Sequence, residues 1–191
     1  MAFVTIVLLV VIGGALAVAV WAMGLYNGLV GKRNQVRNAW SQIDVQLKRR
    51  HDLIPNLVET VKGYAAHEKT TLEGVTRARS QAVAATGVEA QGRAESDLTS
   101  ALGRLMVLVE QYPALQANQN FLGLQEELSS TENRIGFARQ FYNDAVMQMN
   151  NAVQAFPSNI LAGMYGFREE PFFELKDDSE RAVPQVKISQ A

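Results

Sequence analysis

The hydrophobic pattern divides the chain into an uncharged N-terminal run and a long periodic body. No side chain from Ala2 to Tyr26 is charged, and the first charged residue is Lys32. Beyond the run, large apolar residues recur at alternating steps of four and three. They are Val36, Trp40, Ile43, Leu47, Ile54, Leu57, Val61 and Tyr64. Such a seam predicts a helix that packs against partner helices.

Two residues interrupt this seam. Arg50 occupies a position that otherwise points toward a core. Pro55 lacks an N–H and its ring clashes with the carbonyl four residues earlier, so the sequence predicts a kink or a short break near His51. The apolar pattern resumes at once, which favours a kink. The helical pattern then continues to about Thr86.

Two further helices follow. Thr86-Gly87 is a stop signal with glycine in a left-handed conformation, and the next helix starts near Glu89. Its seam is Ala94, Leu98, Ala101, Leu105, Leu108 and Tyr112, and Pro113 either closes it or begins the next helix. The last long helix carries the cleanest stripe, formed by Phe121, Leu124, Leu128, Thr131, Ile135, Ala138, Tyr142, Ala145, Met149, Ala152 and Phe156. Pro157 ends it, and Ser158 is expected to cap a short helix that stops at Gly163 or Gly166.

These elements predict an all-α fold. An N-terminal transmembrane helix is followed by an antiparallel up-and-down bundle of three to four long helices. We expect an anchor over residues 1–29, a bundle over 30–170 and a mobile tail over 171–191, where the sequence becomes polar and short of large apolar groups.

The uncharged run is long enough to cross a membrane. About 25 helical residues rise roughly 37 Å, against a hydrocarbon core of about 30 Å. The absence of a preceding Lys or Arg and the length of the run favour a permanent anchor over a cleaved signal. Lys32, Arg33 and Arg37 follow the span, so the positive-inside tendency places the N-terminus outside and the body in the cytoplasm. Trp21 and Tyr26 suit the membrane interface.

Small residues within the span offer a contact surface. Gly24 and Gly28 form a GxxxG spacing, which lets two helix backbones approach closely. Glycine is also simply common in membrane helices. The spacing is therefore a candidate for self-association and no more.

Composition narrows the possible chemistry. The 18 Lys+Arg nearly balance the 19 Asp+Glu, which argues against nucleic acid as a partner. The sequence has no Cys and only two His, His51 and His67, which are too far apart for a HExxH site. No phosphate loop and no nucleophile constellation is present. We therefore expect no enzymatic activity, no cofactor and no metal.

Several polar and aromatic residues suggest a contact surface. Arg50 either snorkels or pairs with Glu126, Glu127 or Glu132, within one chain or between subunits. Asparagine is a mediocre helix former, so its abundance on the last helix suggests another role. The candidate contact residues are Arg49, Arg50, Asn133, Asn143, Asn150, Phe172 and Phe173.

The sequence resembles the LemA family of bacterial membrane proteins. The resemblance rests on YNGLVGKRNQVRNAWSQIDVQLKRRHDLIPNLVETVKGYAAHE at Tyr26–Glu68 and on NFLGLQEELSSTENRIGFARQFYNDAV at Asn120–Val146, with FPSN at Phe156–Asn159 near the end. It implies a membrane anchor followed by a helical bundle. It supplies no reaction, cofactor or catalytic residue.

Two functions fit these expectations. The first is a non-enzymatic, single-pass scaffold of the bacterial inner membrane that binds lipid and forms homo-oligomers, in membrane stress response or organisation. The second is a monomeric adaptor that presents its bundle to a membrane protease, a signalling kinase or another membrane protein.

Overall fold

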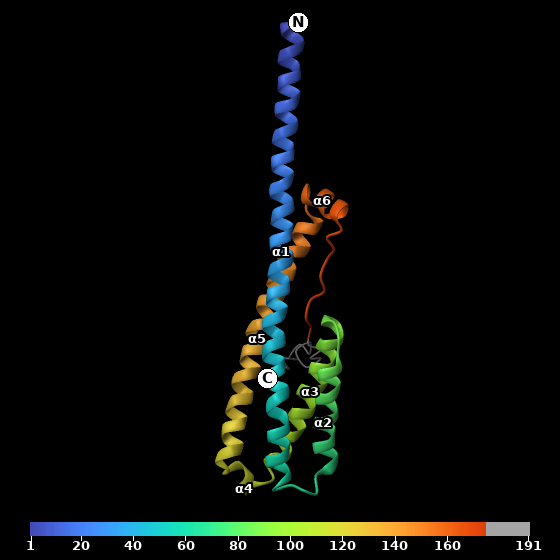
Figure 1. Ribbon diagram of the computed structural model, residues 1–191. Coiled ribbons are helices and arrows are strands. Elements are labelled where there is room, and N and C mark those ends of the chain that lie inside the picture. Colours follow the sequence, from blue (N-terminus) through green and yellow to red (C-terminus); the bar gives the residue numbers. More distant parts are fainter. Residues whose placement is uncertain (175–191) are drawn as a thin grey trace, which may run out of the picture. The chain divides into compact units, whose positions relative to one another are not determined.

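The computed structural model describes residues 1–174, which form helices and turns with no strand among them. The helices are α1 (Ala2–Lys62), α2 (Lys69–Ala84), α3 (Val88–Val109), α4 (Pro113–Gln116), α5 (Gln119–Gln154) and α6 (Ser158–Tyr165) (Figure 1). This confirms the predicted all-α class, in which a long apolar N-terminal helix leads into a helical bundle.

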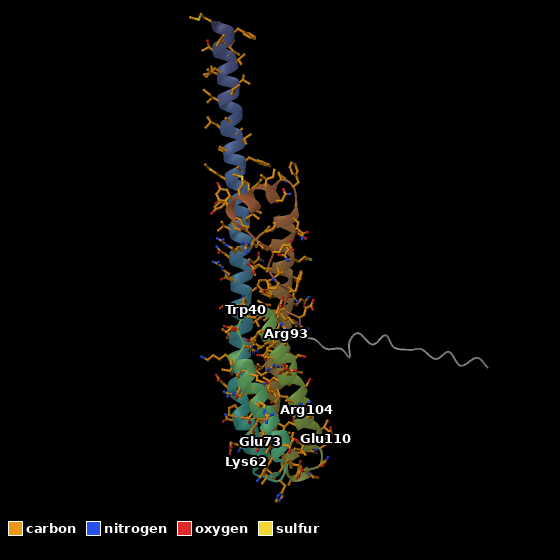
Figure 2. All side chains as sticks on the ribbon, turned by 90° about the vertical axis from the view of Figure 1, so that its right-hand side faces the viewer. Trp40, Lys62, Glu73, Arg93, Arg104 and Glu110 are labelled. Carbon is orange, nitrogen blue, oxygen red and sulfur yellow. The ribbon has the colours of Figure 1, made fainter. Side chains whose placement is uncertain are left out.

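Helix α1 runs without interruption from Ala2 to Lys62. Its first part contains a window of hydropathy high enough to cross a membrane, and none of that window is buried. The side chains there project away from the ribbon (Figure 2). The alternative of a break at Pro55 is wrong, because the residue lies inside the helix and its neighbours Ile54 and Leu57 are buried.

The first helix ends much earlier than predicted. α1 stops at Lys62, a turn follows, and α2 begins at Lys69, whereas the sequence predicts one helix to about Thr86. Tyr64, assigned to the seam, is exposed in this turn, and Ala65 is buried instead. The backbone closes through a hydrogen bond from Ala65 N to Val61 O at 2.8 Å.

The chain divides into two units, each described separately. The first consists of Met1–Val45 and Gly136–Phe172, and the second of Gln46–Ile135 with the described residues 173–174. α1 passes residue 29 without interruption, so the division into residues 1–29, 30–170 and 171–191 stays a prediction.

In the second unit, neighbouring helices run in opposite directions around one apolar core (Figure 1). The core residues come from α1, α2, α3, α4 and the start of α5, and include Ile54, Leu57, Val75, Leu98, Leu105, Leu115 and Phe121. Gly87 precedes α3 with φ of 86° and ψ of 155°, so the predicted stop is confirmed but the conformation is not left-handed helical. Pro113 begins α4, as one alternative predicts.

In the first unit, α1 packs against the second half of α5 and against α6. The Trp40 and Tyr142 rings meet edge to face with centroids 5.4 Å apart. The predicted stripe on α5 is buried from Phe121 to Met149 except for Leu124, which is half-buried; Phe156 lies beyond the helix and is 80% exposed.

The end of the described chain corrects one expectation, the cap at Ser158. Ser158 is the first residue of α6 and does not cap it; its hydroxyl donates to the carbonyls of Ala152 and Ala155, at 2.6 and 2.9 Å. Gly166 ends α6 with φ of 70°. Phe173 is buried. The predicted mobile tail over residues 171–191 stays a prediction, and its part from residue 175 lies outside the described residues.

A buried ionic cluster as the candidate functional site

Arg50 lies at the centre of a buried ionic cluster in the second unit. It shares one face of α1 with Leu47 and Ile54, because residues three and four apart lie on the same side of a helix. That face is turned into the bundle, and Arg50 is 1% exposed. A charge removed from water in this way requires partners.

Both terminal nitrogens of the Arg50 guanidinium have partners. One donates to the Glu95 carboxylate on α3 and to the Glu95 carbonyl oxygen, the latter at 3.3 Å. The other donates to Oε1 of Glu132 on α5 at 2.7 Å and to the Thr99 hydroxyl at 3.2 Å. The Arg50 Nε has no hydrogen-bond partner among the described residues. Arg50 therefore joins three helices.

Glu95 is shared between Arg50 and two further side chains. Its Oε1 lies 2.8 Å from His51 Nε2 and accepts a hydrogen bond from Gln91 Nε2 at 2.7 Å. Burial by itself raises the pKa of Glu95, but the hydrogen bond to His51 and the positive charge of Arg50 outweigh it, so that the pKa lies below its ordinary value. Glu95 is thus held ionised in the interior.

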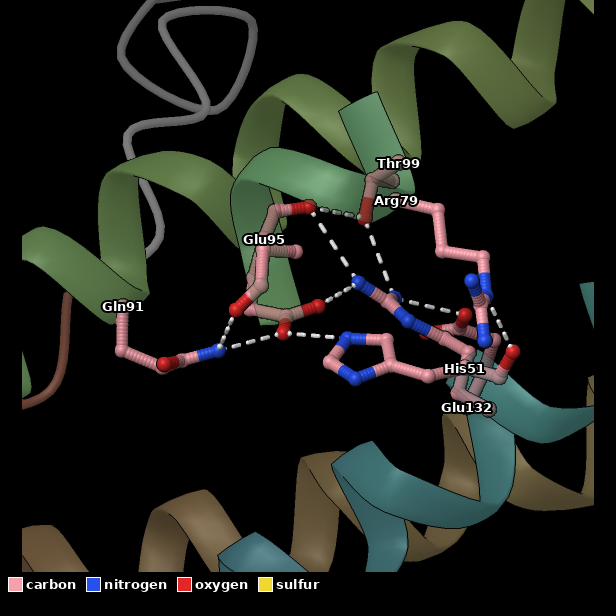
Figure 3. A network of polar contacts seen from close by, with 8 residues as sticks. His51, Arg79, Gln91, Glu95, Thr99 and Glu132 are labelled. Carbon is pink, nitrogen blue, oxygen red and sulfur yellow. Dashed lines mark hydrogen bonds and ion pairs between the residues drawn. The ribbon is translucent and has the colours of Figure 1, made fainter. Parts of the chain in front are cut away.

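Helix α2 is bound to the same cluster through the backbone. Arg79 Nε donates to the His51 carbonyl oxygen at 2.6 Å, and Gln91 Nε2 donates to the Ala82 carbonyl oxygen at 3.0 Å. The cluster therefore holds α1, α2, α3 and α5 of the second unit together by polar contacts (Figure 3).

The arrangement favours a structural role over a chemical one. Glu95 and Arg50 are each 1% exposed, and the Glu95 oxygens already have partners. A catalytic carboxylate needs access to a substrate, and of the two carboxylates bound to Arg50 only Glu132, with a side chain 39% exposed, reaches the surface. Within residues 1–174, no three His, Asp or Glu side chains form a group that could hold a metal ion.

Part of this cluster is predictable from the sequence. The pairing of Arg50 with Glu132 is one of the predicted alternatives, whereas Glu95, Gln91 and Thr99 are not predicted. A signal for Glu95 exists: it precedes Leu98, Leu102, Leu105 and Val109 at steps of three and four, and all are buried. A carboxylate in the apolar seam of one helix is the expected partner of an arginine in the seam of another.

The other predicted contact residues separate into exposed and buried groups. Arg49 is exposed and lies 3.9 Å from Glu127, and Asn133 is exposed too. Asn143 is half-buried and Phe172 is 43% exposed. Arg50, Asn150 and Phe173 are buried within the chain. A contact surface formed by these seven residues stays a prediction.

Asn150 binds its own chain. In the first unit its side chain accepts a hydrogen bond from the Glu170 N–H at 2.8 Å and donates to the Glu170 carbonyl at 3.0 Å. The Tyr142 hydroxyl donates to the Pro171 carbonyl at 2.9 Å. Burial and the Glu170 charge raise the pKa of Tyr142 to about 12. These contacts fix the segment after α6 against α5.

The predicted membrane-interface residues all lie on α1 in the first unit. Trp21 is 54% exposed, and Tyr26 lies against the rings of Tyr165 and Phe167, with centroids 4.8 and 5.7 Å away. The Arg33 guanidinium stands 4.8 Å from the centre of the Phe167 ring, a cation–π contact. Lys32 is half-buried and Arg37 exposed.

Gly24 and Gly28 present an open surface. A Cβ at either position meets no atom within 4 Å. Association of helices through this GxxxG stays a prediction.

Comparison with known proteins agrees with this architecture. The family model for the LemA family matches residues 39–188. The chain is 28% identical over 189 residues to Magnetosome protein MamQ 2 of Paramagnetospirillum magneticum, covering 84% of this chain and 70% of that protein. It is 26% identical over 189 residues to Magnetosome protein MamQ of Magnetospirillum gryphiswaldense, with the same coverage. It is 30% identical over 142 residues to Protein LemA of Metamycoplasma hominis, covering 73% of this chain and 64% of that protein. The chain belongs to the LemA family.

Proposed function

We propose that this protein is a non-enzymatic, membrane-anchored scaffold that self-assembles at the surface of the bacterial inner membrane. One observation carries the proposal: the same helix, α1, is apolar and fully exposed near its N-terminus and buried along a seam from Leu29 onward. A continuous helix of this kind ties a folded body to the membrane without a flexible linker.

The buried cluster supports a non-enzymatic role. Its charged groups neutralise one another inside the second unit, where a substrate has no access to Glu95. Buried ion pairs of this type align elements of a fold.

Exposed aromatic residues on α5 support self-assembly. Phe137 is 73% exposed and Phe141, one turn later, is 42% exposed, so both lie on the same side of the helix. Large apolar side chains gathered on a polar surface mark protein contacts.

The mass of the purified full-length protein in mild detergent and in lipid nanodiscs tests the scaffold. We expect an oligomer, and a Phe137→Ser, Phe141→Ser variant that dissociates to smaller species. Val83→Ser is the matched control, because Val83 is 57% exposed on α2. A strict monomer in every condition contradicts self-assembly.

The adaptor alternative has one feature in its favour. Next to α1 and α2 an open groove of about 850 Å³ has Val58 and Leu72 in its lining, with Glu59, Lys62 and Lys69 among its charged residues. A membrane protease, a kinase or another membrane protein is the partner class for such a groove. Crosslinking in intact membranes separates the functions: a scaffold crosslinks mostly to itself, an adaptor to one dominant foreign protein.

Topology belongs to the same proposal. Lys32, Arg33 and Arg37 follow the apolar segment and no basic side chain precedes it, so we place the N-terminus outside and the body in the cytoplasm. Labelling of single cysteines in intact cells with a membrane-impermeant reagent tests this. Labelling at Val107→Cys before lysis contradicts a cytoplasmic body.

A further inference from the structure

Helix α6 exposes large apolar side chains that the bundle does not cover. Ile160 is 55% exposed and Met164, one turn later, is 72% exposed; Phe156 in the preceding turn is 80% exposed. No charged side chain lies between Asp144 and Arg168. Three large, exposed apolar side chains in a stretch without any charge are unusual for a helix that faces water.

The opposite side of α6 packs on α1 within the first unit (Figure 1). The Tyr165 ring lies against Tyr26, and Ala162 is buried. An open groove of about 430 Å³ between the helices is lined by Ala19, Ala22, Met23, Tyr26, Asn27, Leu161 and Tyr165. These α1 residues belong to the charge-free part of that helix.

The length of the charge-free part of α1 places this contact at the membrane. From Ala2 to Gly31 the helix rises roughly 45 Å at 1.5 Å per residue, whereas the hydrocarbon core measures about 30 Å. With the span beginning at the N-terminus of α1, the surplus lies at the end where α6 packs. α6 therefore lies at the depth of the interfacial region when α1 spans the bilayer.

The basic residues at the end of the charge-free part of α1 match an anionic lipid surface. They are Lys32, Arg33 and Arg37, whereas after α6 the charge of Arg168 is offset by Glu169 and Glu170. Basic residues next to a buried apolar face attract anionic head groups.

We propose that α6, with Phe156, lies in the membrane interface as a second lipid contact, and that a lipid acyl chain fills the groove between α6 and α1. The inference rests on the proposed function, because it requires α1 to span the membrane. The occupant is lipid because the exposed face of α6 is uncharged and continues the apolar surface of α1.

Single labels in the full-length protein test the proposal. The sequence has no Cys, so Met164→Cys introduces one labelling site for a fluorophore. Leu9→Cys on α1 reports the anchor, and Val107→Cys, 61% exposed on α3, reports the aqueous surface. Each protein is reconstituted in phosphatidylcholine–phosphatidylglycerol liposomes and titrated with iodide, or prepared with lipids that carry a nitroxide on the acyl chain.

We expect the labels at 164 and 9 to be quenched by the nitroxide lipids and shielded several-fold from iodide. The label at 107 is expected to be quenched by iodide and not by the nitroxide lipids. Ile160→Cys repeats the measurement at a second position. The inference is overturned if the labels at 164 and 107 are equally accessible to iodide while the label at 9 lies in lipid. In that case α1 still spans the membrane. If the label at 9 also faces water, the proposed function fails as well.

A label at 164 that is shielded from both quenchers also overturns the inference, because protein then covers α6. Spin labels at the same position identify that protein. Dipolar coupling between copies of the chain assigns the exposed face of α6 to a second copy.

Discussion

At the scale of single residues, Arg49 and Arg50 are neighbours with opposite environments. Arg49 is about half exposed and 3.9 Å from Glu127, whereas Arg50 is buried against Glu95. We predict that Arg50→Met lowers the free energy of unfolding by about 3–5 kcal/mol, since the buried Glu95 carboxylate loses its arginine partner. Arg49→Met, the matched control, changes it by at most about 1 kcal/mol. Urea unfolding followed by circular dichroism measures both; equal losses contradict the assigned role of the cluster.

Glu95 gives the fold a defined sensitivity to acid. Its pKa in the folded protein lies below the ordinary value of 4.5, so the unfolded chain takes up the proton more readily. The stabilisation that ionised Glu95 contributes is complete above pH 4.5. It decreases as the pH falls through the pKa of Glu95 in the folded protein.

We predict that Glu95→Gln is less stable than the natural protein at pH 7 and that the difference narrows below pH 4.5. Unfolding free energies at a series of pH values between neutral and acid measure this. If the difference in unfolding free energy stays constant over the whole pH range, the charge of Glu95 does not stabilise the folded protein.

At the scale of the elements, the seams predicted from sequence account for most of the helices. The stripes on α3 and α5 lie in the core because their spacing permits no other buried face. The turn after Lys62 was not predictable in the same way. Ala65 and Ala66 favour a helix, and Gly63 alone is a weak stop signal. The chain turns there because α2 returns to pack on α3 in the second unit. Helix propensity depends on neighbouring residues only and does not predict this packing.

The candidate site shows the same limit. The position of Arg50 on a seam marks it as an unusual residue, and its charge calls for a carboxylate. Glu95 and Glu132 lie on different helices, 45 and 82 residues away in the sequence. Spacing within one helix does not select the carboxylate that a bundle brings into contact.

Gly92 on α3 lies under the end of the described chain, in the second unit. A Cβ at this position would stand 2.5 Å from the Glu174 carbonyl oxygen and 3.8 Å from the Phe173 ring. Close approach of backbone is one reason for a glycine in a helix. Gly92 therefore lets residues 173–174 lie directly on α3.

We predict that Gly92→Ala displaces this segment and is destabilising, although alanine is the better helix former. Gly103→Ala on the same helix meets no atom within 4 Å and gains up to about 1 kcal/mol from helix propensity. Thermal unfolding of the two variants provides the comparison. Equal stabilisation of both argues against the contact.

At the scale of the whole molecule, the first part of α1 contributes no packing against the rest of residues 1–174. Residues 2–18 are exposed throughout. We predict that a protein lacking them keeps its free energy of unfolding to within about 0.5 kcal/mol, as for other changes at an exposed surface. Deletion through Leu29 removes a core residue and is expected to destabilise. Urea titrations of both truncated proteins in one detergent test this; a large loss in the shorter deletion contradicts it.

The buried cluster also determines how the helices align along their length. Apolar seams with a seven-residue repeat fit nearly as well when one helix slides by a repeat, roughly 10 Å, along its neighbour. Such a slide of α1 would place Ile43 or Leu57 where Arg50 meets Glu95, and would leave the buried Glu95 charge without its arginine partner. The cost of that arrangement excludes it. Arg50 and Glu95 thus select one alignment among several that an apolar core alone would accept.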